Sequence, residues 1–271
     1  MAGHRDDPSG PAREPALNLP SVVVWLIAVL VLVQGARELL STRDDILLVS
    51  WLAFVPARLT LVFAPERLED IARSLAAGGV QDVAQRMQLI RLLLTDGGSQ
   101  PWSLISYGLL HASWLHLISN AVWLAAFGSP VARRLGPGRF LVLMTLSTLG
   151  GALLHWWSRE LEILPLVGAS AAVAGATAAA IRFVFSPGVN FGGLGRDEVV
   201  RAIPAEPFGG LWRNPRVLIF VVIWFVTNLL FGAGVVPILG EETGIAWEAH
   251  IGGFVAGLLL FPLFDRGPVR R

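Results

Sequence analysis

The stretch IAWEAHIGGFVAGLLLFPLF, residues 245–264, is twenty residues long, and Glu248 and His250 are its only ionisable side chains. A helix rises about 1.5 Å per residue and must cross about 30 Å of hydrocarbon, so roughly 20 mostly apolar residues predict a transmembrane helix. In hydrocarbon, every backbone polar group needs a partner within the protein, and a helix supplies one for each. The stretch therefore predicts an all-α membrane protein.

Five further apolar stretches are predicted to cross the membrane, and they lie at residues 19–40, 114–131, 140–157, 167–185 and 217–231. With residues 245–264 they predict a polytopic bundle of six transmembrane helices over residues 19–264. A long loop, residues 41–113, follows the first helix. Its apolar run at residues 46–55 is too short to span the bilayer and is predicted to lie at the membrane interface.

The composition agrees with a membrane protein and excludes several other classes. Hydrophobic residues make up 54% of the chain and charged residues 15%, whereas soluble domains carry about 25% charged residues. The chain has no cysteine, which excludes disulfides and thiolate metal sites. With a net charge of +1 and no long basic run, nothing indicates a nucleic-acid partner. Membrane lipids are the partner that the composition predicts.

Arginine gathers in alternate predicted loops and in the C-terminal tail. The residues are Arg133, Arg134, Arg139, Arg196, Arg201, Arg213, Arg216, Arg266, Arg270 and Arg271. Because cytoplasmic loops carry an excess of basic residues, both termini are predicted to be cytoplasmic and the loop 41–113 to lie outside. Residues 1–18, rich in proline, are predicted to be a disordered tail, and residues 265–271 a second tail. We expect a multi-pass protein of the cell (inner) membrane.

Four polar side chains within the predicted spans are expected at one shallow depth below the outer surface. His116 and Asn120 are four residues apart and so share a helix face. Ser170 lies near the start of its span, and His250 lies about 8 Å into the sixth. Polar residues within spans are costly and usually mark function. These four are therefore the candidate functional residues.

Small residues indicate which spans touch. Gly168 and Gly175 flank the start of the fourth span, and Gly253 and Gly257 form a G-x-x-x-G in the sixth. Small residues let two helix backbones approach closely. The fourth and sixth spans are therefore predicted to pack together, which would bring Ser170 and His250 within the hydrogen-bond reach that activates a nucleophile.

Each of these features also has a purely structural explanation. A serine in a span commonly bonds back to its own helix, an intramembrane histidine can serve packing, and a G-x-x-x-G is usually only a packing motif. Asn228 is expected to join helices, and Glu248 to face water near the start of its span. No single residue decides between these interpretations.

Three blocks in order resemble the rhomboid family of intramembrane serine proteases. They are His111-Ala-Ser-Trp-Leu-His116-Leu-Ile-Ser-Asn120, Gly168-Ala-Ser170-Ala171 and Ala249-His250-Ile-Gly-Gly253. They are similar to the family's H-x-x-x-x-H-x-x-x-N, G-x-S-G and A-H-x-x-G, on the second, fourth and sixth spans. The resemblance covers about residues 19–264 and implies a six-helix rhomboid-like bundle.

That resemblance implies a serine endopeptidase that cleaves transmembrane segments near the outer face. Ser170 would be the nucleophile and His250 the base, as a dyad. His116 and Asn120 would stabilise the oxyanion beside the Ser170 backbone N–H, with Gly168 in a supporting place. No cofactor or metal is expected, because the chain has no thiolates and no metal-binding motif. The partners would be single-pass transmembrane proteins.

Two positions depart from the family pattern. Ala171 follows the nucleophile where glycine is usual, which adds a methyl group beside the oxyanion site. Ala174 stands where many members have an aromatic ring that stacks on the catalytic histidine. We expect activity to survive the first change, and we expect the second to leave the His250 ring less constrained.

Other functions stay open. A catalytically silent rhomboid-like protein would bind and escort transmembrane segments, and a transporter or channel would also place polar groups in its spans. The polar residues cluster at one depth without an inverted repeat, which disfavours a transporter. The chain lacks H-E-x-x-H and Gly-x-Gly-Asp motifs, which disfavours the zinc and aspartyl classes of intramembrane protease. The oligomeric state is not predicted.

Overall fold

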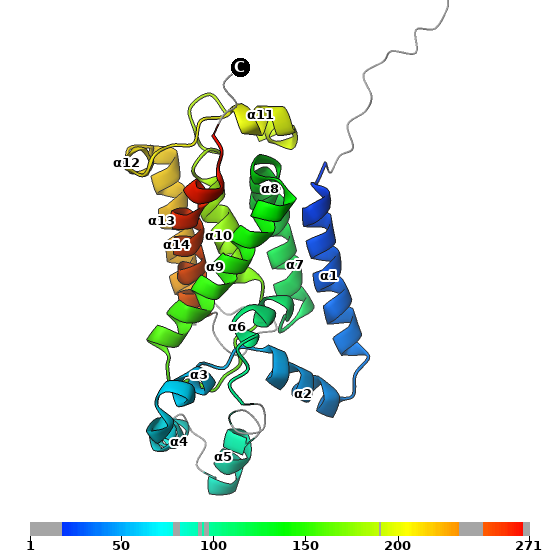
Figure 1. The fold of residues 1–271 in the computed structure, drawn as a ribbon, viewed down its shortest axis with the longest axis vertical. Helices are drawn as coiled ribbons and strands as arrows, with labels where there is room; N and C mark the ends of the chain where they lie inside the picture. The colour runs from blue at the N-terminus through cyan, green and yellow to red at the C-terminus, as the bar shows by residue number, and fades with distance from the viewer. Residues whose placement is uncertain are drawn as a thin grey trace, which may run out of the picture.

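The computed structural model of the protein describes residues 18–77, 82–91, 94, 98–189, 191–232 and 246–267. The predicted disordered tail, except Asn18, and residues 268–271 of the predicted C-terminal tail lie outside the described residues. The described part is built from helices, as the apolar runs predict (Figure 1).

Five helical segments in the described residues are long and apolar enough to cross a membrane. They are α1 (Ser21–Glu38), the continuous segment Trp114–Leu135, α9 (Pro137–Ser158), α13 (Pro215–Gly232) and α14 (Trp247–Phe264). The segment Trp114–Leu135 comprises α7 (Trp114–Trp123), a π-helical turn η4 (Leu124–Gly128) and α8 (Ser129–Leu135). Five of the six predicted spans are therefore confirmed as long apolar helices.

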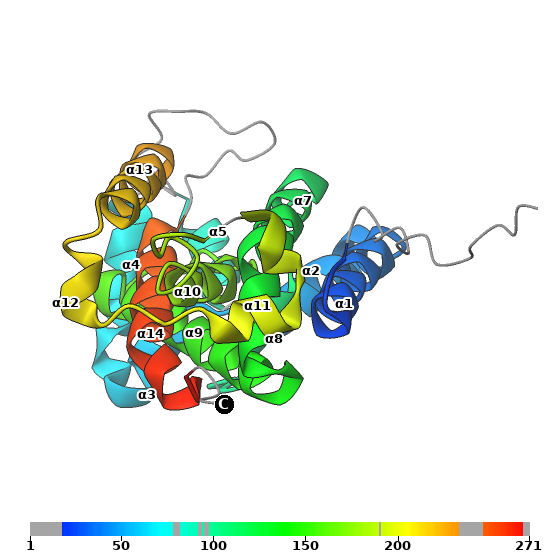
Figure 2. The same cartoon turned by 90° about the horizontal axis from the view of Figure 1, so that it is seen from above.

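The fourth predicted span differs from its expectation. The helix α10 covers only Ser170–Ala180, eleven residues and so about 16 Å, instead of the whole of residues 167–185. Gly168 has a φ of +123°, outside the helical region, so the chain cannot be helical through that residue. α10 packs against α9, α14 and the α7–α8 segment near the middle of the bundle (Figure 2). Ala171–Ala180 are all buried, so the short helix is enclosed by protein.

The described residues between 41 and 113 form a helical layer at one end of the bundle (Figure 1). Its elements are α2 (Thr42–Leu52), α3 (Pro56–Phe63), η1 (Pro65–Arg67), α4 (Leu68–Ala77), α5 (Val83–Ile90), α6 (Ser103–Ser106) and η3 (Tyr107–Leu109). The layer is joined to the chain that precedes α10. The Phe54 and Leu166 backbones form a β-bridge, and the Thr60 hydroxyl donates to the Glu160 carbonyl at 2.6 Å. The predicted long outer loop is thus a folded cap over the loop between α9 and α10.

The opposite end of the bundle holds the arginine-rich loops. Arg134 pairs with Asp265 at 2.9 Å, beyond the end of α14, and Arg133 pairs with Asp197 at 2.7 Å, at the start of α11 (Asp197–Ala202). Arg133 also donates to the carbonyl of Asn18, just before α1. Both ends of the described chain therefore lie beside the arginine-rich loops, as the six-span topology predicts.

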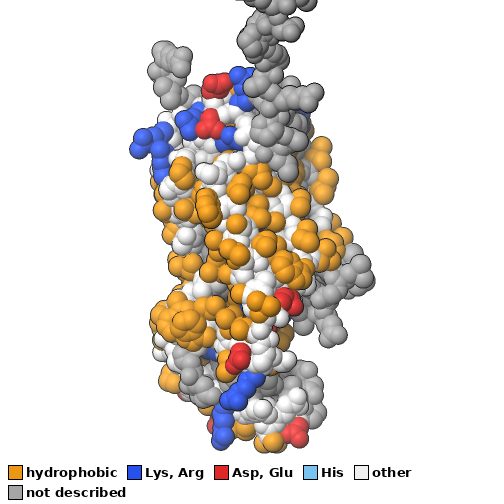
Figure 3. Space-filling view, turned by 90° about the vertical axis from the view of Figure 1, so that its right-hand side faces the viewer, with side chains coloured by type: hydrophobic (Ala, Val, Ile, Leu, Met, Phe, Trp, Pro, Cys, Tyr) orange, Lys and Arg blue, Asp and Glu red, His pale blue; other side chains and the backbone are white. Residues whose placement is uncertain are grey.

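Between these two ends the surface is apolar. Hydrophobic side chains spread over the middle of the face in Figure 3, while most of the charged side chains visible there lie toward its two ends. Trp25 on α1 is 70% exposed and Leu263 on α14 is 75% exposed. An exposed apolar band of this kind fits a lipid environment. The protein is an all-α, multi-pass membrane protein.

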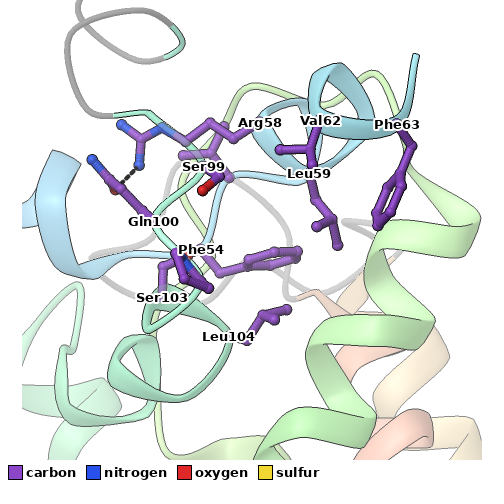
Figure 4. A pocket seen from close by; sticks show the side chains of 11 residues that line it. Phe54, Arg58, Leu59, Val62, Phe63, Ser99, Gln100, Ser103 and Leu104 are labelled. Atoms are coloured by element: carbon purple, nitrogen blue, oxygen red, sulfur yellow. Dashed lines mark hydrogen bonds between the residues drawn. The ribbon is translucent and has the colours of Figure 1, made fainter. Parts of the chain in front are cut away.

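The cap contains a hollow beside α3 (Figure 4). Its walls are mostly apolar, and the buried Arg58 guanidinium donates there to the Gln100 side chain and to the Ser50 carbonyl. Burial lowers the pKa of Arg58 to about 10, so the group stays charged at neutral pH. Ser170 and His250 do not line this hollow. It is a feature of the cap, separate from the candidate residues in the bundle.

Candidate active site

The helices α10 and α14 touch through glycine, as the G-x-x-x-G of the sixth span predicts. A methyl group added at Gly253 would overlap the backbone of Ala171, and one added at Gly257 would overlap the backbone of Gly175. The two contacts are one helical turn apart on each helix, so the backbones lie against each other over this length. The predicted close packing of these two spans is confirmed.

This packing sets the positions of Ser170 and His250. Ser170 is the first residue of α10 and directly precedes Ala171. His250 lies three residues before Gly253 on α14, so it is one turn away on the same side of the helix. Since Ala171 touches Gly253, the serine and the histidine lie on adjoining turns of two helices in contact. Both side chains are half-buried.

His116 lies beside the serine. A Cβ built at Gly168 would be 2.8 Å from Cε1 and 2.9 Å from Nε2 of His116, and 3.6 Å from the Ser170 hydroxyl oxygen. The His116 ring therefore occupies the space that a side chain at Gly168 would need. Gly168 also has a positive φ of +123°, which side chains rarely tolerate. Both observations require glycine here, and the absent side chain lets His116 approach Ser170.

Asn120 lies one turn along α7 from His116, on the same face, as predicted. It is 5% exposed, and its Nδ2 donates to the His116 carbonyl at 2.9 Å. An amide nitrogen carries two hydrogens, and this bond takes one of them. The bond fixes the side chain against its own helix beside the His116 ring.

His111 contacts both the His116 ring and the backbone just before α10. It precedes α7 and is fully buried, and its ring meets the His116 ring edge-on with centroids 5.1 Å apart. Burial, aided by the nearby His116 and Arg37, lowers the pKa of His111 to about 3. A neutral ring can accept a hydrogen bond, and His111 Nε2 lies 3.5 Å from the Ala169 amide nitrogen, directly before α10.

The start of α10 faces this cluster with backbone donors. The first N–H groups of a helix have no partner within it, and the helix dipole makes that end positive. Ser170 is the first helical residue, so its own N–H belongs to this set. Such a helix start can stabilise negative charge that develops on an oxygen beside Ser170.

Ala171 and Ala174, the two positions that depart from the family pattern, are both buried between helices. The Ala171 methyl is fully buried and packs on Gly151 of α9, where an added Cβ would overlap it. Ala174 belongs to a buried apolar cluster with Phe254 of α14, and Phe254 stacks on Trp224 of α13 with centroids 4.7 Å apart. The two helices α13 and α14 thus contribute aromatic rings to the cluster that contains Ala174.

Two residues near His250 were not predicted to have their observed contacts. Glu248 is 5% exposed and pairs with Arg159 at 2.8 Å, so the expectation that it faces water was wrong. Asn228 of α13 places its Oδ1 2.5 Å from Nδ1 of His250. The sequence signal for this contact was the one amide in the stretch 217–231, where Thr227 is the only other side chain with a hydroxyl or amide group. Within the described residues, no cluster of His, Asp or Glu suited to hold a metal ion is found.

The glycine contact gives a stability prediction. Gly253→Ala should destabilise the protein by about 1–3 kcal/mol, because its methyl group would push α14 away from the α10 backbone. Gly35→Ala is the matched control, since a methyl group at Gly35 on α1 would meet nothing within 4 Å. The measurement is the thermal unfolding midpoint of both variants in the same detergent. Equal midpoints for the two variants would show that α10 and α14 are not packed through Gly253.

The stretch of chain that contains the contact between α10 and α14 is similar to a known protein family. Residues 98–266, more than half of the chain, match the family model of the Rhomboid domain. A protein named rhomboid protease GlpG from Pectobacterium atrosepticum is 30% identical over 169 residues, which is 59% of this chain and 48% of the relative. GlpG proteins from Serratia proteamaculans and Yersinia enterocolitica are 30% and 31% identical, over 47% of their own lengths.

This chain thus spans about half the length of the curated relatives it matches. The matched stretch contains the whole of α7 to α14, and so every residue that meets at the contact between α10 and α14. On the strength of that match, the chain belongs to the rhomboid family.

Proposed function

We propose that this protein is an intramembrane serine endopeptidase in which Ser170 and His250 form the catalytic dyad. The observation that carries the proposal is the glycine contact between α10 and α14, which sets Ser170 and His250 on adjoining turns. The relatives are named rhomboid proteases, which supports the same reaction class.

In this proposal the Ser170 hydroxyl oxygen attacks a peptide carbonyl of the substrate while Nε2 of His250 takes the hydroxyl proton. The resulting oxyanion accepts hydrogen bonds from the Ser170 N–H, His116 and Asn120. His250 then returns the proton to the leaving amine, and the peptide bond breaks to leave an acyl ester on Ser170. Water, deprotonated by His250, hydrolyses the ester and restores the serine. Gly168 has no side chain, and this leaves the space in which the His116 ring lies beside Ser170.

The membrane setting is part of the same proposal. Both termini would be cytoplasmic and the cap of residues 41–113 would lie outside, in the cell (inner) membrane. α10 is about 16 Å long, about half of what a span needs, so its first residue would lie within the bilayer and not at its surface. His250 is three residues beyond Trp247, the first residue of α14, so the dyad would lie about one turn below the outer end of that helix. The substrates would be single-pass transmembrane proteins cut near that face.

The proposal is tested with the purified protein in liposomes that contain a single-pass reporter. We expect cleavage without ATP and in the presence of EDTA, because the dyad needs neither a nucleotide nor a metal. Fragments are identified by mass spectrometry. Activity that EDTA removes and zinc restores would contradict the serine mechanism, and reporter capture without any cleavage would favour the escort function instead.

A further inference from the structure

The base His250 has a defined partner on a helix that does not carry the nucleophile. Asn228 of α13 places its Oδ1 2.5 Å from His250 Nδ1. The same amide donates through Nδ2 to the Trp224 carbonyl, at 2.7 Å, one turn back on α13. One side chain therefore bonds both its own helix and the ring of His250.

These two bonds determine which ring nitrogen of His250 carries the hydrogen. The Trp224 carbonyl can only accept, so it takes the NH₂ end of the Asn228 amide and leaves the amide oxygen toward His250. An amide oxygen can also only accept, so Nδ1 of His250 must be the donor. In a neutral imidazole the other nitrogen, Nε2, is then the acceptor that a general base requires.

The contact between Asn228 and His250 is the middle one of three contacts between α13 and α14, spaced about one helical turn apart. One turn before Asn228, the Trp224 ring stacks on Phe254, with centroids 4.7 Å apart. One turn after it, Gly232 lies so close to Trp247 that a methyl group there would overlap the indole ring. Pairs 224–254, 228–250 and 232–247 follow one antiparallel register. Because contacts on both sides fix this register, the position of Asn228 opposite His250 is built into the packing of the two helices.

We propose that Asn228 is a positioning residue that holds the His250 imidazole in the tautomer and orientation needed to deprotonate Ser170. This inference rests on the proposed function. The resemblance to the family implies that many members stack an aromatic ring on this histidine from the position of Ala174, so the restraint from Asn228 would act in place of that ring. A neutral amide also avoids the cost of an ionised carboxylate within the bilayer, and an amide serves in the same place in Cys-His-Asn proteases.

The test compares three variants of the full chain. Asn228→Leu removes the acceptor but keeps a side chain of similar size that suits an apolar helix. Asn228→Asp keeps an oxygen acceptor. Thr227→Leu is the matched control, because Thr227 is the exposed neighbouring residue and its hydroxyl bonds only the Ile223 carbonyl, at 2.7 Å, among its described contacts.

Two readouts separate positioning from a purely structural role. The first is kcat and KM for a transmembrane reporter in liposomes. We expect Asn228→Leu to lower kcat by about 10- to 100-fold with KM within about twofold, a loss like that seen when a group that orients a metal-bound histidine is removed. Asn228→Asp should recover at least part of that loss, and Thr227→Leu should match the wild type.

The second readout is the ¹⁵N chemical shift of the ring nitrogens in histidine-labelled protein. The chain has five histidines, and His250→Ala identifies the signals of His250. The wild type should show a protonated Nδ1 and an unprotonated Nε2 at His250. In Asn228→Leu these shifts should move toward the opposite tautomer, while Thr227→Leu should leave them in place.

The proposal is overturned if Asn228→Leu retains the kcat of Thr227→Leu. It is equally overturned if kcat falls while the His250 shifts do not move, since the loss would then be structural. The shifts do not depend on cleavage. A wild type that cleaves no reporter would contradict the proposed protease function, and the ¹⁵N comparison would still decide whether Asn228 sets the tautomer.

Discussion

Ser170→Ala is expected to reduce cleavage of a transmembrane reporter to background, a loss of about 10⁶-fold if the dyad behaves like other serine protease sites. His250→Ala should cost about as much, because nucleophile and base act as a unit and losing either removes the covalent step. The measurement is the rate at which the N-terminal fragment appears in liposomes, followed over days for the variants.

Ser158→Ala is the matched control for the serine change. The Ser158 hydroxyl bonds the Leu154 and His155 carbonyls of its own helix, at 2.8 and 3.1 Å, so its loss should leave cleavage unchanged. Both dyad variants should elute from a sizing column like the wild type. A dyad variant that keeps more than about a hundredth of the wild-type rate would show that Ser170 or His250 lacks its assigned role, since single removals in such sites cost far more.

The second large effect is expected in the substrate. A transmembrane helix hides each backbone carbonyl in a hydrogen bond, so Ser170 can attack only where the helix unwinds. Relative to a good helix former, glycine lowers helix stability by about 1 kcal/mol and proline by about 3 kcal/mol. Replacing one glycine and one proline near the outer end of a reporter with leucine should therefore slow cleavage by up to about 10³-fold.

The control reporter carries the same replacements in its cytoplasmic half, where they should have little effect. Mass spectrometry should locate the cut near the outer face and after a small residue, because Gly168, Ala169 and Ala171 surround Ser170 in the sequence and lie in tightly packed surroundings. Equal cleavage of the leucine-substituted outer half, or cuts near the cytoplasmic end, would contradict the proposed depth and orientation of the site.

The long apolar runs could be predicted as helices because length and hydropathy alone decide whether a segment can span a bilayer. The fourth run could not. Residues 167–185 are mostly apolar, with Arg182 as their one charged side chain, but helix α10 begins only at Ser170 and ends at Ala180. The interruption depends on the +123° φ at Gly168 and on the His116 ring packed against that glycine. A tertiary contact sets this boundary, and hydropathy carries no information about it.

The candidate site could be predicted only in part. Glycine spacing indicated which helices touch, and Gly253 does pack on the Ala171 backbone. The partner of His250 was not predictable, because Asn228 reaches it only in the register that α13 adopts against α14. The pairing of Glu248 with Arg159 likewise joins separate elements. Patterns within one helix reveal its faces, whereas the register between two helices depends on how both pack.

The most direct measurement of the dyad is covalent labelling with a serine-reactive fluorophosphonate, read by peptide mass spectrometry. The reagent reacts preferentially with a serine whose nucleophilicity a neighbouring base raises, and no substrate needs to be known. We expect label on the wild-type peptide that contains Ser170, and none in Ser170→Ala or His250→Ala. Label that persists in Ser170→Ala, or a wild type that takes up no label, would contradict the assignment of Ser170 as an activated nucleophile.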